Sequence, residues 1–527
     1  MTTTSNLAPS TAASADRATV QTRIVLAAIL LLAAGLRVMA LDKPLYIDEI
    51  VTLTVGTQPL AKMGTVMRQI DASPALYPVL LHGWLQLARS DAWARALSAL
   101  FGFMAVCVVY LIGRRVFGVR TGLAAAFVAA IAPAHVHYAQ YVRSYSLFTL
   151  LAGVQLLIMI GWFGSAGRLR WRAVALTLVT AAMLYTHYLA LLVVVPEGVY
   201  AACHLRDAWR RAMGWGLAMA LAVVLFLPGV PLLAHNIAFD RARNEARAAP
   251  PAAERLVPNL VAELSVGQRA LGFSDPRVRR ATLTGAAVVF PLLMAFGIAG
   301  GWREDRDRTL LLLLFASLPV AVYVLSGRRL VAVRFFLPYM VAYLVLLGHG
   351  LATMGRSLRT VTALVLLVVS AVPLVHFYRL YEWSYDHRAV STAIGRRLQP
   401  TDVLLFVHPY ESFYYRWYLG DHVTMKGLVF TALEDQGAYA IKPPPLTLDV
   451  AKPRVQAAAQ AYERLWLIGQ SKRSFASDAR EELRLVRWMD REYSLVEDFS
   501  RLTGADPIIR LYSRVRPGRG TRMLRRE

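Results

Sequence analysis

The chain has 527 residues, of which 56% are hydrophobic, and it carries a formal net charge of +24 at pH 7. Repeated apolar runs of about 20 residues are long enough to span a bilayer, so the composition excludes an ordinary soluble protein and indicates a polytopic helical membrane protein. In such a protein the positive charge is explained by topology and by anionic headgroups, so we expect anionic lipids but no nucleic acid among its partners.

The two cysteines, Cys107 and Cys203, lie in or beside apolar segments. This number and placement indicate neither a disulfide framework nor a cysteine metal site.

The N-terminal residues 1–23 are rich in Ser, Thr and Ala without a hydrophobic period, which predicts a disordered tail on the cytoplasmic side. The first apolar run, Ile24–Leu41, is interpreted as an uncleaved signal anchor whose Arg37 snorkels to the outer headgroups. A cleaved signal peptide stays open as an alternative, because Val38–Ala40 loosely resembles a cleavage site.

The later apolar runs bring the prediction to about eleven transmembrane helices, within a membrane domain that covers 24–380. The further predicted spans are 93–112, 121–134, 146–163, 172–187, 189–203, 215–233, 281–300, 309–325, 335–352 and 360–378. When the spans are counted alternately, the short arginine-rich loops, such as 114–120 and 168–172, fall on one side, which the positive-inside rule makes cytoplasmic. The outward side then receives 42–92, 134–145, the turn at 187, 234–280, 326–334 and everything after about 379.

Two acidic residues, Asp48 and Glu49, stand side by side in the first outward loop, within the otherwise uncharged run Leu45–Thr54. Carboxylates at a membrane boundary are costly to desolvate unless another group uses or pairs them. They form either the N-terminal turn of an interfacial helix, stabilised by its dipole, or the acidic centre of a catalytic site. The outward segments that follow favour catalysis.

The next outward segments carry histidines, tyrosines and one arginine. Arg143 is the only cation in the short, aromatic turn 134–145, and His187 lies in the following turn. The tyrosines suit an interfacial belt. His135 and His137 have a spacing that, in extended chain, brings two imidazoles to one metal. A divalent cation held by these histidines or by the two carboxylates therefore stays open.

The outward segment 234–280 carries a run of arginines against the positive-inside expectation. Attraction to anionic headgroups explains them, and a basic flap over a phosphate-bearing substrate is the alternative. Arg328, Arg329 and Arg334 then flank the outer end of the next pair of spans. Arg334 could grip a phosphate with two hydrogen bonds just above the hydrocarbon.

After the last span the composition predicts a small extracytoplasmic α/β domain over 381–513. Strand-like runs at 402–407, 464–468, 493–499 and 508–512 alternate with helical stretches near 388–398, 411–419, 454–463 and 477–490. The domain contains no glycine-rich phosphate loop and no nucleophile elbow. The last residues, 514–527, form a basic tail that is solvated or binds a polyanion.

Several of these segments resemble one family. Tyr46–Glu49 resembles the Asp-Glu motif of GT-C membrane glycosyltransferases, in particular the family 39-type group of protein O-mannosyltransferases and aminoarabinose transferases. Asp71–Tyr77 resembles that group's Asp-x-His-Pro-Pro-Leu-Tyr string, and Tyr138–Tyr145 resembles its Tyr-Ser-Gln-Glu-Ala-Arg-x-Tyr string. Thr186–Tyr188 and Arg334–Pro338 also match typical family segments. The likeness covers about residues 24–380 in order and orientation.

The chain departs from the family strings at several positions. Ser73 and Ala75 replace the usual His and second Pro, and Tyr141 stands where an acid is common. The missing His and the missing acid place the family's metal in question.

The resemblance implies a hexosyl- or pentosyltransferase of the cell envelope that moves a sugar from a polyprenyl-phosphate donor to an acceptor hydroxyl, with inversion. The acceptor is a lipid, a glycan or a protein. Because such a donor keeps its tail in the bilayer and its phosphate at the surface, the catalytic base belongs in an outward loop. The resemblance also implies a multi-pass protein of the bacterial cytoplasmic membrane, with the active site and the C-terminal domain on the periplasmic side.

The resemblance assigns roles to individual residues. Asp48 is the expected base, and Glu49 orients it or helps to hold a divalent cation. Arg143 and Arg334 stabilise the leaving phosphate. The candidate substrate-binding residues are Asp71, Tyr77, His137, Tyr138, Tyr145 and His187.

Three other classes stay open. A lipid-linked glycan flippase or transporter would show polar residues inside its spans, whereas the spans predicted here are apolar. An O-antigen-ligase-like enzyme would use a diphosphate-linked glycan and would not need the Asp-Glu pair. A non-catalytic membrane scaffold would tolerate the loss of Asp48.

Overall fold

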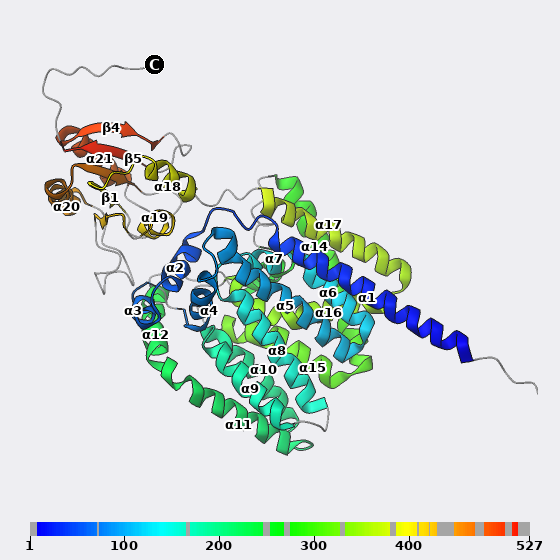
Figure 1. The fold of residues 1–527 in the computed structure, drawn as a ribbon. Coiled ribbons are helices and arrows are strands. Elements are labelled where there is room, and N and C mark those ends of the chain that lie inside the picture. The colour runs from blue at the N-terminus through cyan, green and yellow to red at the C-terminus, as the bar shows by residue number, and fades with distance from the viewer. Residues whose placement is uncertain are drawn as a thin grey trace, which may run out of the picture. The chain divides into compact units, whose positions relative to one another are not determined.

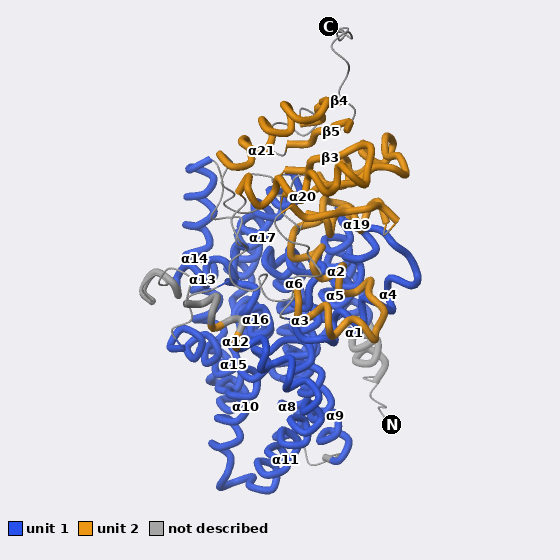
Figure 2. The backbone as a smooth tube through the Cα atoms, turned by 90° about the vertical axis from the view of Figure 1, so that its left-hand side faces the viewer, with its two compact units in different colours: residues 1–41, 73–237, 244–380 blue, residues 42–72, 238–243, 381–527 orange. Residues whose placement is uncertain are grey.

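The structure is a computed structural model that describes residues 8–70, 73–164, 169–245, 253–267, 275–326, 332–379, 386–407, 411–420, 422–428, 447–469, 479–500 and 508–514. The chain divides into two compact units, each assembled from separate stretches of sequence (Figure 1 and Figure 2). Unit 1 comprises 1–41, 73–237 and 244–380, and unit 2 comprises 42–72, 238–243 and 381–527. The first predicted outward loop is therefore split, because 42–72 fold with the C-terminal part of the chain.

Unit 1 is helical. Its elements are α1 (Ala8–Val38), α4 (Leu76–Leu85), α5 (Asp91–Phe117), α6 (Val119–Ile131), α7 (Pro133–Ala139), α8 (Tyr145–Gly164), α9 (Leu169–Leu184), η1 (Tyr188–Ala190), α10 (Leu191–Cys203), α11 (Trp209–Phe226), η2 (Leu227–Gly229), α13 (Ala253–Val266), α14 (Pro276–Glu304), α15 (Arg306–Leu325), η4 (Val333–Phe335), η5 (Leu337–Tyr339), α16 (Met340–Thr353) and α17 (Arg356–Arg379). The residues of α12 (Val230–Glu245) are divided between the two units.

Seven helices of the described residues are long and apolar enough to cross a membrane, or eight if α6 and α7, bent by 63°, form one broken span. The other three predicted spans coincide with the shorter helices α9, Tyr188–Cys203 and Leu337–Thr353. A straight helix needs about 20 residues to cross the hydrocarbon. The predicted total of about eleven thus exceeds the seven or eight, although every predicted span coincides with helix. The chain is a multi-pass integral membrane protein.

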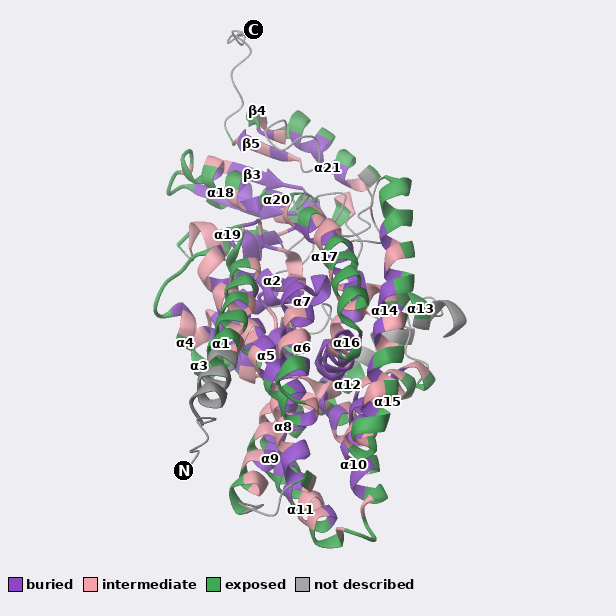
Figure 3. Cartoon of the chain, turned by 90° about the vertical axis from the view of Figure 1, so that its right-hand side faces the viewer, coloured by how far each residue is buried: buried purple, intermediate pink, exposed green. Residues whose placement is uncertain are grey.

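Close packing around α16 forms the centre of unit 1. α16 contacts α14, α6 and α5, and nearly all of its residues are buried, whereas α1 and α17 expose long stretches (Figure 3). Gly297 of α14 and Gly350 of α16 lie where the two backbones touch: a Cβ on Gly350 would lie 1.9 Å from the carbonyl oxygen of Leu293. Small residues allow helices in a membrane to approach this closely.

Arg37, near the end of α1, corrects a sequence expectation. Its side chain is fully buried, so the predicted snorkelling to the headgroups is wrong. The guanidinium donates to the carbonyl oxygens of Ala129 (3.0 Å) and Ala130 (3.2 Å) at the end of α6. The carbonyl of Ala129 would normally accept from the N–H four residues later, but that residue is Pro133, which has none. Arg37 therefore supplies the donor that the bend between α6 and α7 removes.

Polar groups inside the helices correct a second expectation. Gln155 of α8 and Glu197 of α10 are fully buried, so the prediction that the spans are apolar is wrong here. Gln155 Nε2 donates to Glu197 Oε2 (3.1 Å), and Trp215 Nε1 of α11 donates to the same oxygen (3.2 Å). These bonds link three helices, which offsets part of the desolvation cost of the polar groups.

Unit 2 contains a mixed five-stranded sheet in the order β2-β1-β3-β5-β4. The strands are β1 (Asp402–Phe406), β2 (Met425–Gly427), β3 (Arg464–Ile468), β4 (Ser494–Asp498) and β5 (Ile509–Ser513). β1 pairs in parallel with β2 and β3, while β5 is antiparallel to β3 and β4. Every residue of β1 is buried, as expected of a strand covered on both faces. The four predicted strands are found, and only the short β2 was not predicted.

Helices cover both faces of this sheet. They are α18 (His387–Gly395), α19 (Ser412–Leu419), α20 (Leu448–Ala461) and α21 (Ala479–Glu492). Unit 2 also contains α2 (Ile47–Gly56) and α3 (Leu60–Ile70), from the first loop. Val403 and Leu405 of β1 pack into one core with residues of α20 and α21. Phe406, which points to the other face, meets Tyr415 of α19 at 5.2 Å. α19 also packs against α2, so the predicted acidic loop is part of this unit.

Candidate active site

Arg143 lies in the turn that precedes α8, in unit 1, and two groups of contacts hold this turn. Gln140 Nε2 donates to carbonyls at the end of α1, including those of Leu36 (3.0 Å) and Met39 (2.9 Å). The buried Tyr77 hydroxyl bonds Ser98 Oγ at 2.6 Å, and Ser98 Oγ lies 3.4 Å from the carbonyl oxygen of Arg143. The sequence predicted Tyr77 as a substrate-binding residue. In the structure its hydroxyl supports the turn that carries Arg143.

The Arg143 guanidinium is half-buried and donates to Ser73 Oγ at 3.2 Å. Ser73 is one of the positions at which the chain departs from the family string, where a histidine is usual. The replacement therefore places a hydroxyl beside the guanidinium. A hydroxyl can both donate and accept a hydrogen bond, so a second polar group lies next to Arg143 as a result.

His187 lies between α9 and η1 and is surrounded by rings. Its imidazole stacks on Phe148 at 5.2 Å and lies 6.3 Å from Tyr145. Its Nδ1 accepts from the backbone N–H of Leu189 (3.2 Å), which leaves the proton of the neutral ring on Nε2. Although part of its surface stays exposed, burial and then the charges of Arg143 and Arg334 lower the pKa of His187 to about 3. The imidazole is thus a neutral N–H donor at physiological pH.

Arg334 approaches the same histidine from η4, far along the chain. Its guanidinium lies over the ring of Phe335 at 5.4 Å, and Phe335 in turn meets His187 edge-on at 6.0 Å. Arg143, His187 and Arg334 therefore form one cluster in unit 1, which we call the arginine site. The sequence predicted all three as functional residues, and the fold brings them together.

Tyrosines form one wall beside the arginine site. Tyr138, Tyr141 and Tyr145 are buried and meet one another at 5.5–6.4 Å between ring centres. His137 stacks on Tyr138 at 4.8 Å and also meets Phe377 of α17. Tyr145 connects this cluster to the arginine site through His187. An aromatic wall of this kind suits the apolar face of a sugar ring or the start of a lipid tail.

Asp48 and Glu49 occupy the first turn of α2 in unit 2, which we call the carboxylate turn. Glu49 is fully buried, and its Oε2 accepts from the backbone N–H of Tyr46 at 2.9 Å, as in a capping box. Asp48 is partly exposed. The predicted helix N-terminal turn is therefore present, and within it Glu49 has a positioning contact that fixes the turn bearing Asp48.

The C-terminal part of unit 2 adds residues to this turn that the sequence did not predict. Tyr414 of α19 is buried, and burial followed by the charges of Glu411 and Glu49 raises its pKa well above the usual value. His387 stacks on Tyr414 at 3.7 Å between ring centres, and burial lowers the pKa of His387 to about 3. The available signal was the aromatic run that follows Glu411, which contains Tyr414, Tyr415 and Tyr418.

The histidines suggested for a metal do not form a pair. His135 and His137 lie on the helix α7 rather than in extended chain, so a spacing of two residues turns their side chains to different sides. His135 Nδ1 accepts a hydrogen bond from Arg37 (2.9 Å). Among the described residues, no three His, Cys, Asp or Glu side chains are grouped to hold a metal ion. Asp71, Arg328 and Arg329 lie outside the described residues.

A family model matches the segment that carries much of this geometry. Residues 72–231, which contain Arg143 and His187, match the family described as dolichyl-phosphate-mannose-protein mannosyltransferase. This segment belongs to that glycosyltransferase family. The resemblance predicted from the sequence and the predicted enzyme class, a glycosyltransferase, are confirmed. No curated protein matches the chain.

Solved structures share the fold over nearly the whole chain. ArnT from Cupriavidus metallidurans in the apo state matches with a TM-score of 0.63 at 14% identity, over 95% of this chain and 98% of that chain. The same protein bound to undecaprenyl phosphate matches with a TM-score of 0.64 at 14% identity, over 94% and 98%. The archaeal oligosaccharyltransferase AglB from Archaeoglobus fulgidus, in complex with an inhibitory peptide and a dolichol-phosphate, matches with a TM-score of 0.52 at 12% identity, over 94% and 74%. The predicted fold class is thereby confirmed.

Proposed function

We propose that this glycosyltransferase moves a hexose or pentose from a polyprenyl-phosphate donor to an acceptor hydroxyl, with inversion at the anomeric carbon. The acceptor oxygen attacks that carbon while the bond to the phosphate oxygen breaks. Polyprenyl phosphate then leaves, and the acceptor proton passes to a base of the protein. The donor class is also supported by the ligands of two structures of the same fold, undecaprenyl phosphate in ArnT and dolichol-phosphate in AglB.

The observation that carries this proposal is the arginine site. Two guanidinium groups from distant parts of the chain, Arg143 and Arg334, act on one histidine, and Ser73 adds a hydroxyl. Negative charge grows on the leaving phosphate as the glycosidic bond breaks, so fixed cations stabilise the transition state more than the ground state. Guanidinium groups also match the spacing of phosphate oxygens.

His187 has a separate role in this proposal. With a pKa of about 3, its ring stays neutral and cannot act as a base or an acid near neutral pH. Because Nδ1 already accepts from Leu189, the Nε2–H is the group available to a phosphate oxygen. We therefore assign His187 as a hydrogen-bond donor to the leaving group.

Asp48 is the proposed general base. It is partly exposed, whereas the neighbouring Glu49 is buried and bonded to the start of α2. A positioned base accelerates such a proton transfer by about 10²–10⁴-fold. Glu49 is proposed as a positioning residue that fixes the carboxylate turn. No step is assigned to a metal, because His135 and His137 turn to different sides of α7 and, among the described residues, no three His, Cys, Asp or Glu side chains are grouped to hold one.

We further propose that the chemistry takes place on the outer face of a bacterial cytoplasmic membrane. The proposal is supported by the arginine-rich loops between spans, which the positive-inside rule places in the cytoplasm. Arg143 and His187 lie in turns that alternate with those loops along the chain. A lipid, glycan or protein acceptor would then be reached from the periplasm.

The other classes are less well supported. A flippase is expected to have polar residues inside its spans, and the buried Gln155 and Glu197 are such residues. They hydrogen-bond to one another, and Glu197 also accepts from Trp215, so these contacts give them a structural role. The family match favours a transferase over a transporter or a scaffold. An O-antigen-ligase-like enzyme would act on diphosphate-linked glycans, so a transfer assay with monophosphate and diphosphate donors separates it from the proposed enzyme.

The proposal is tested by a transfer assay on the purified full-length chain in liposomes. Radiolabelled sugars are supplied on polyprenyl phosphate, on polyprenyl diphosphate and on a nucleotide, with membrane lipids, glycans and proteins of the host as acceptors. We expect label transfer from one or more polyprenyl-phosphate sugars only. Transfer from the diphosphate or the nucleotide donor, with none from any monophosphate donor, would overturn the proposal.

A further inference from the structure

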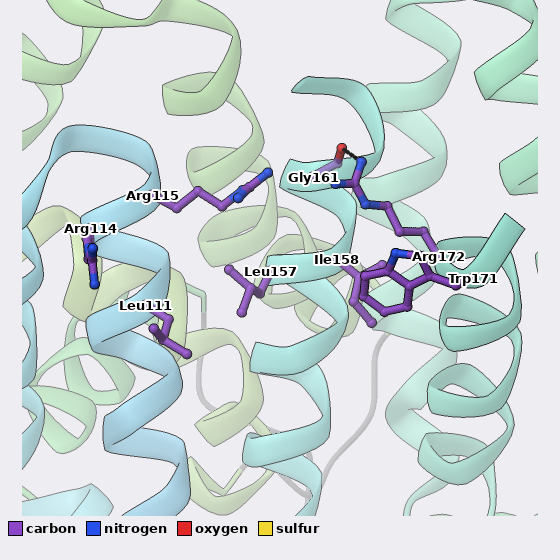
Figure 4. Close-up of a pocket in the computed structure, with 8 residues that line it drawn as sticks. All are labelled: Leu111, Arg114, Arg115, Leu157, Ile158, Gly161, Trp171 and Arg172. Atoms are coloured by element: carbon purple, nitrogen blue, oxygen red, sulfur yellow. Dashed lines mark hydrogen bonds between the residues drawn. The ribbon is translucent and has the colours of Figure 1, made fainter. Parts of the chain in front are cut away.

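A hollow lies at the end of α8 that is far from the arginine site. It lies entirely in unit 1, between the last turns of α5 and α8 and the first turn of α9, and has a volume of about 450 Å³ (Figure 4). Arg143 precedes the start of α8, whereas Gly161 lines the hollow near its end. At 1.5 Å per residue the two positions are about 25 Å apart along the helix axis. The hollow is therefore separate from the proposed donor site.

Two guanidinium groups converge on the glycine in this hollow. Arg172 of α9 donates from Nη1 to the carbonyl oxygen of Gly161 at 2.5 Å. A Cβ on Gly161 would lie 3.4 Å from Arg115 Nη2 and 3.5 Å from Arg172 Cζ. Figure 4 shows Arg115 reaching from α5 toward Gly161, while Arg172 approaches from the opposite side. The absence of a side chain at Gly161 thus lets two cations from different helices face one spot.

No acidic side chain among the described residues forms an ion pair with Arg114 or Arg115, and both arginines are exposed. An anion that lies between Arg115 and Arg172 would be attracted by both guanidinium groups, and more strongly at the edge of a low-dielectric region than in water. Guanidinium groups recognise phosphate by paired hydrogen bonds. The charge arrangement therefore indicates a phosphate-type anion.

The remaining walls are apolar and show which phosphate compound fits. Leu111 of α5 lies one turn before Arg115, and Leu157 and Ile158 of α8 lie one turn before Gly161. All three are therefore nearer the middle of their helices than the arginines are. Trp171 beside Arg172 is 53% exposed, as is typical of an aromatic side chain at the headgroup level. A free phosphate would leave these apolar side chains uncovered. A phospholipid would cover them with an acyl chain while its headgroup meets the arginines.

We propose that this hollow is a binding site for an anionic phospholipid. The phosphate lies between Arg115 and Arg172, Arg114 supports the headgroup from the side, and one acyl chain runs along Leu111 and Leu157. The site lies at the loops predicted to be cytoplasmic, where basic pockets between membrane helices bind anionic lipids. It anchors the α5, α8 and α9 ends without taking part in the transfer reaction.

The test uses the purified full-length chain and native mass spectrometry with added phosphatidylglycerol or phosphatidylcholine. We expect retention of phosphatidylglycerol at least tenfold above that of phosphatidylcholine. The double variant Arg115→Gln/Arg172→Gln should reduce this preference to below about twofold, a loss of roughly 1 kcal/mol or more by the tenfold-per-1.4 kcal/mol relation. The matched control, Arg303→Gln/Arg356→Gln, removes two exposed arginines from other loops on the same predicted side and should keep the preference.

Two further measurements guard against misfolding and against a simple anion site. Arg115→Lys/Arg172→Lys keeps both charges and should retain most of the preference, and the elution volume and melting temperature of each variant verify its fold. Brominated phosphatidylglycerol should quench a fluorescence component that is missing in Trp171→Phe. An unchanged preference in the glutamine variant, or complete competition by millimolar inorganic phosphate, would overturn the proposal.

Discussion

At the scale of single residues, His187 is what distinguishes Arg143 and Arg334 from the many other arginines of the chain. An ordinary imidazole titrates near pH 6.5, and the fall of the His187 pKa to about 3 follows from burial and from these two charges. Arg143 precedes α8 and Arg334 lies in η4, so only the fold brings their charges to one ring. In the proposed function, both cations stabilise a leaving phosphate whose negative charge grows during the reaction.

A first prediction concerns these cations. Arg143→Lys and Arg334→Lys keep the charge but lose the planar two-point grip, so each should lower the transfer rate at saturating donor by about tenfold or more. The exposed Arg279→Lys, at the start of α14, is the matched control and should change the rate by less than about twofold. Rates that are equal in all three variants, and that respond alike to salt, would mean that only a diffuse basic surface attracts the donor.

A second prediction concerns stability at low pH. Because the pKa of His187 falls from about 6.5 in the unfolded chain to about 3 in the fold, the unfolded state binds more protons between these values. Stability from the neutral ring is therefore complete above pH 6.5 and is lost as the pH falls toward 3. The melting temperature in detergent should drop less steeply from pH 7 to 4.5 in His187→Gln than in the wild type. The exposed His235→Gln serves as control, and a wild-type slope in His187→Gln would contradict the assignment.

At the scale of elements, the sequence predicted the positions of helices and strands better than it predicted bends, short helices and the hydrogen bonds at helix ends. The long apolar runs are helices and the four strand-like runs are strands, because the length and the hydrophobic period of each run are enough to identify the element. The bend at Pro133 was not predicted. The hydrogen bond that Ala129 loses there is replaced by one from Arg37, which lies in a helix distant along the chain. His135 and His137 were assumed extended because seven residues are too few for a helical period to be recognised.

A third prediction tests the close packing of α14 on α16. In Gly350→Ala the new Cβ would lie 1.9 Å from the carbonyl oxygen of Leu293, so one helix must move. Overpacking of this kind costs about 1–3 kcal/mol. A melting temperature several degrees below that of the wild type is expected. Gly355→Ala, where no atom lies within 4 Å of the added Cβ, should melt as the wild type does. Equal melting temperatures for the two variants would show that the helices are not in contact at Gly350.

At the scale of the whole molecule, the sequence could not predict how the first outward loop is assembled. Asp48 and Glu49 were identified from their neighbours, but residues 42–72 fold with the C-terminal residues, where α2 packs on α19. Contacts between segments more than 300 residues apart leave no local pattern in a single sequence. For the same reason the position of Tyr414 beside the carboxylate turn was not predicted, whereas Arg143, His187 and Arg334 were singled out because they lie in short segments between predicted spans.

A fourth prediction concerns topology. With eleven crossings the residues after 381 lie on the side opposite to the N-terminus, whereas eight crossings would place them on the same side. In a variant without native cysteines, single cysteines from Arg120→Cys and Arg303→Cys should be labelled from the cytoplasm. Those from Arg89→Cys, Arg279→Cys and Lys452→Cys should be labelled from outside. Cytoplasmic labelling at Lys452→Cys would mean that one of the short helices does not cross.

A single-turnover measurement of Asp48→Asn tests whether Asp48 is the base in transfer from a polyprenyl-phosphate sugar. The amide has nearly the same shape but cannot accept the proton, so donor binding should stay within about twofold of the wild type. Transfer and release of polyprenyl phosphate should slow by about 10²-fold or more. A transfer rate in Asp48→Asn within a few-fold of the wild type, at the same donor occupancy, would mean that Asp48 is not the base.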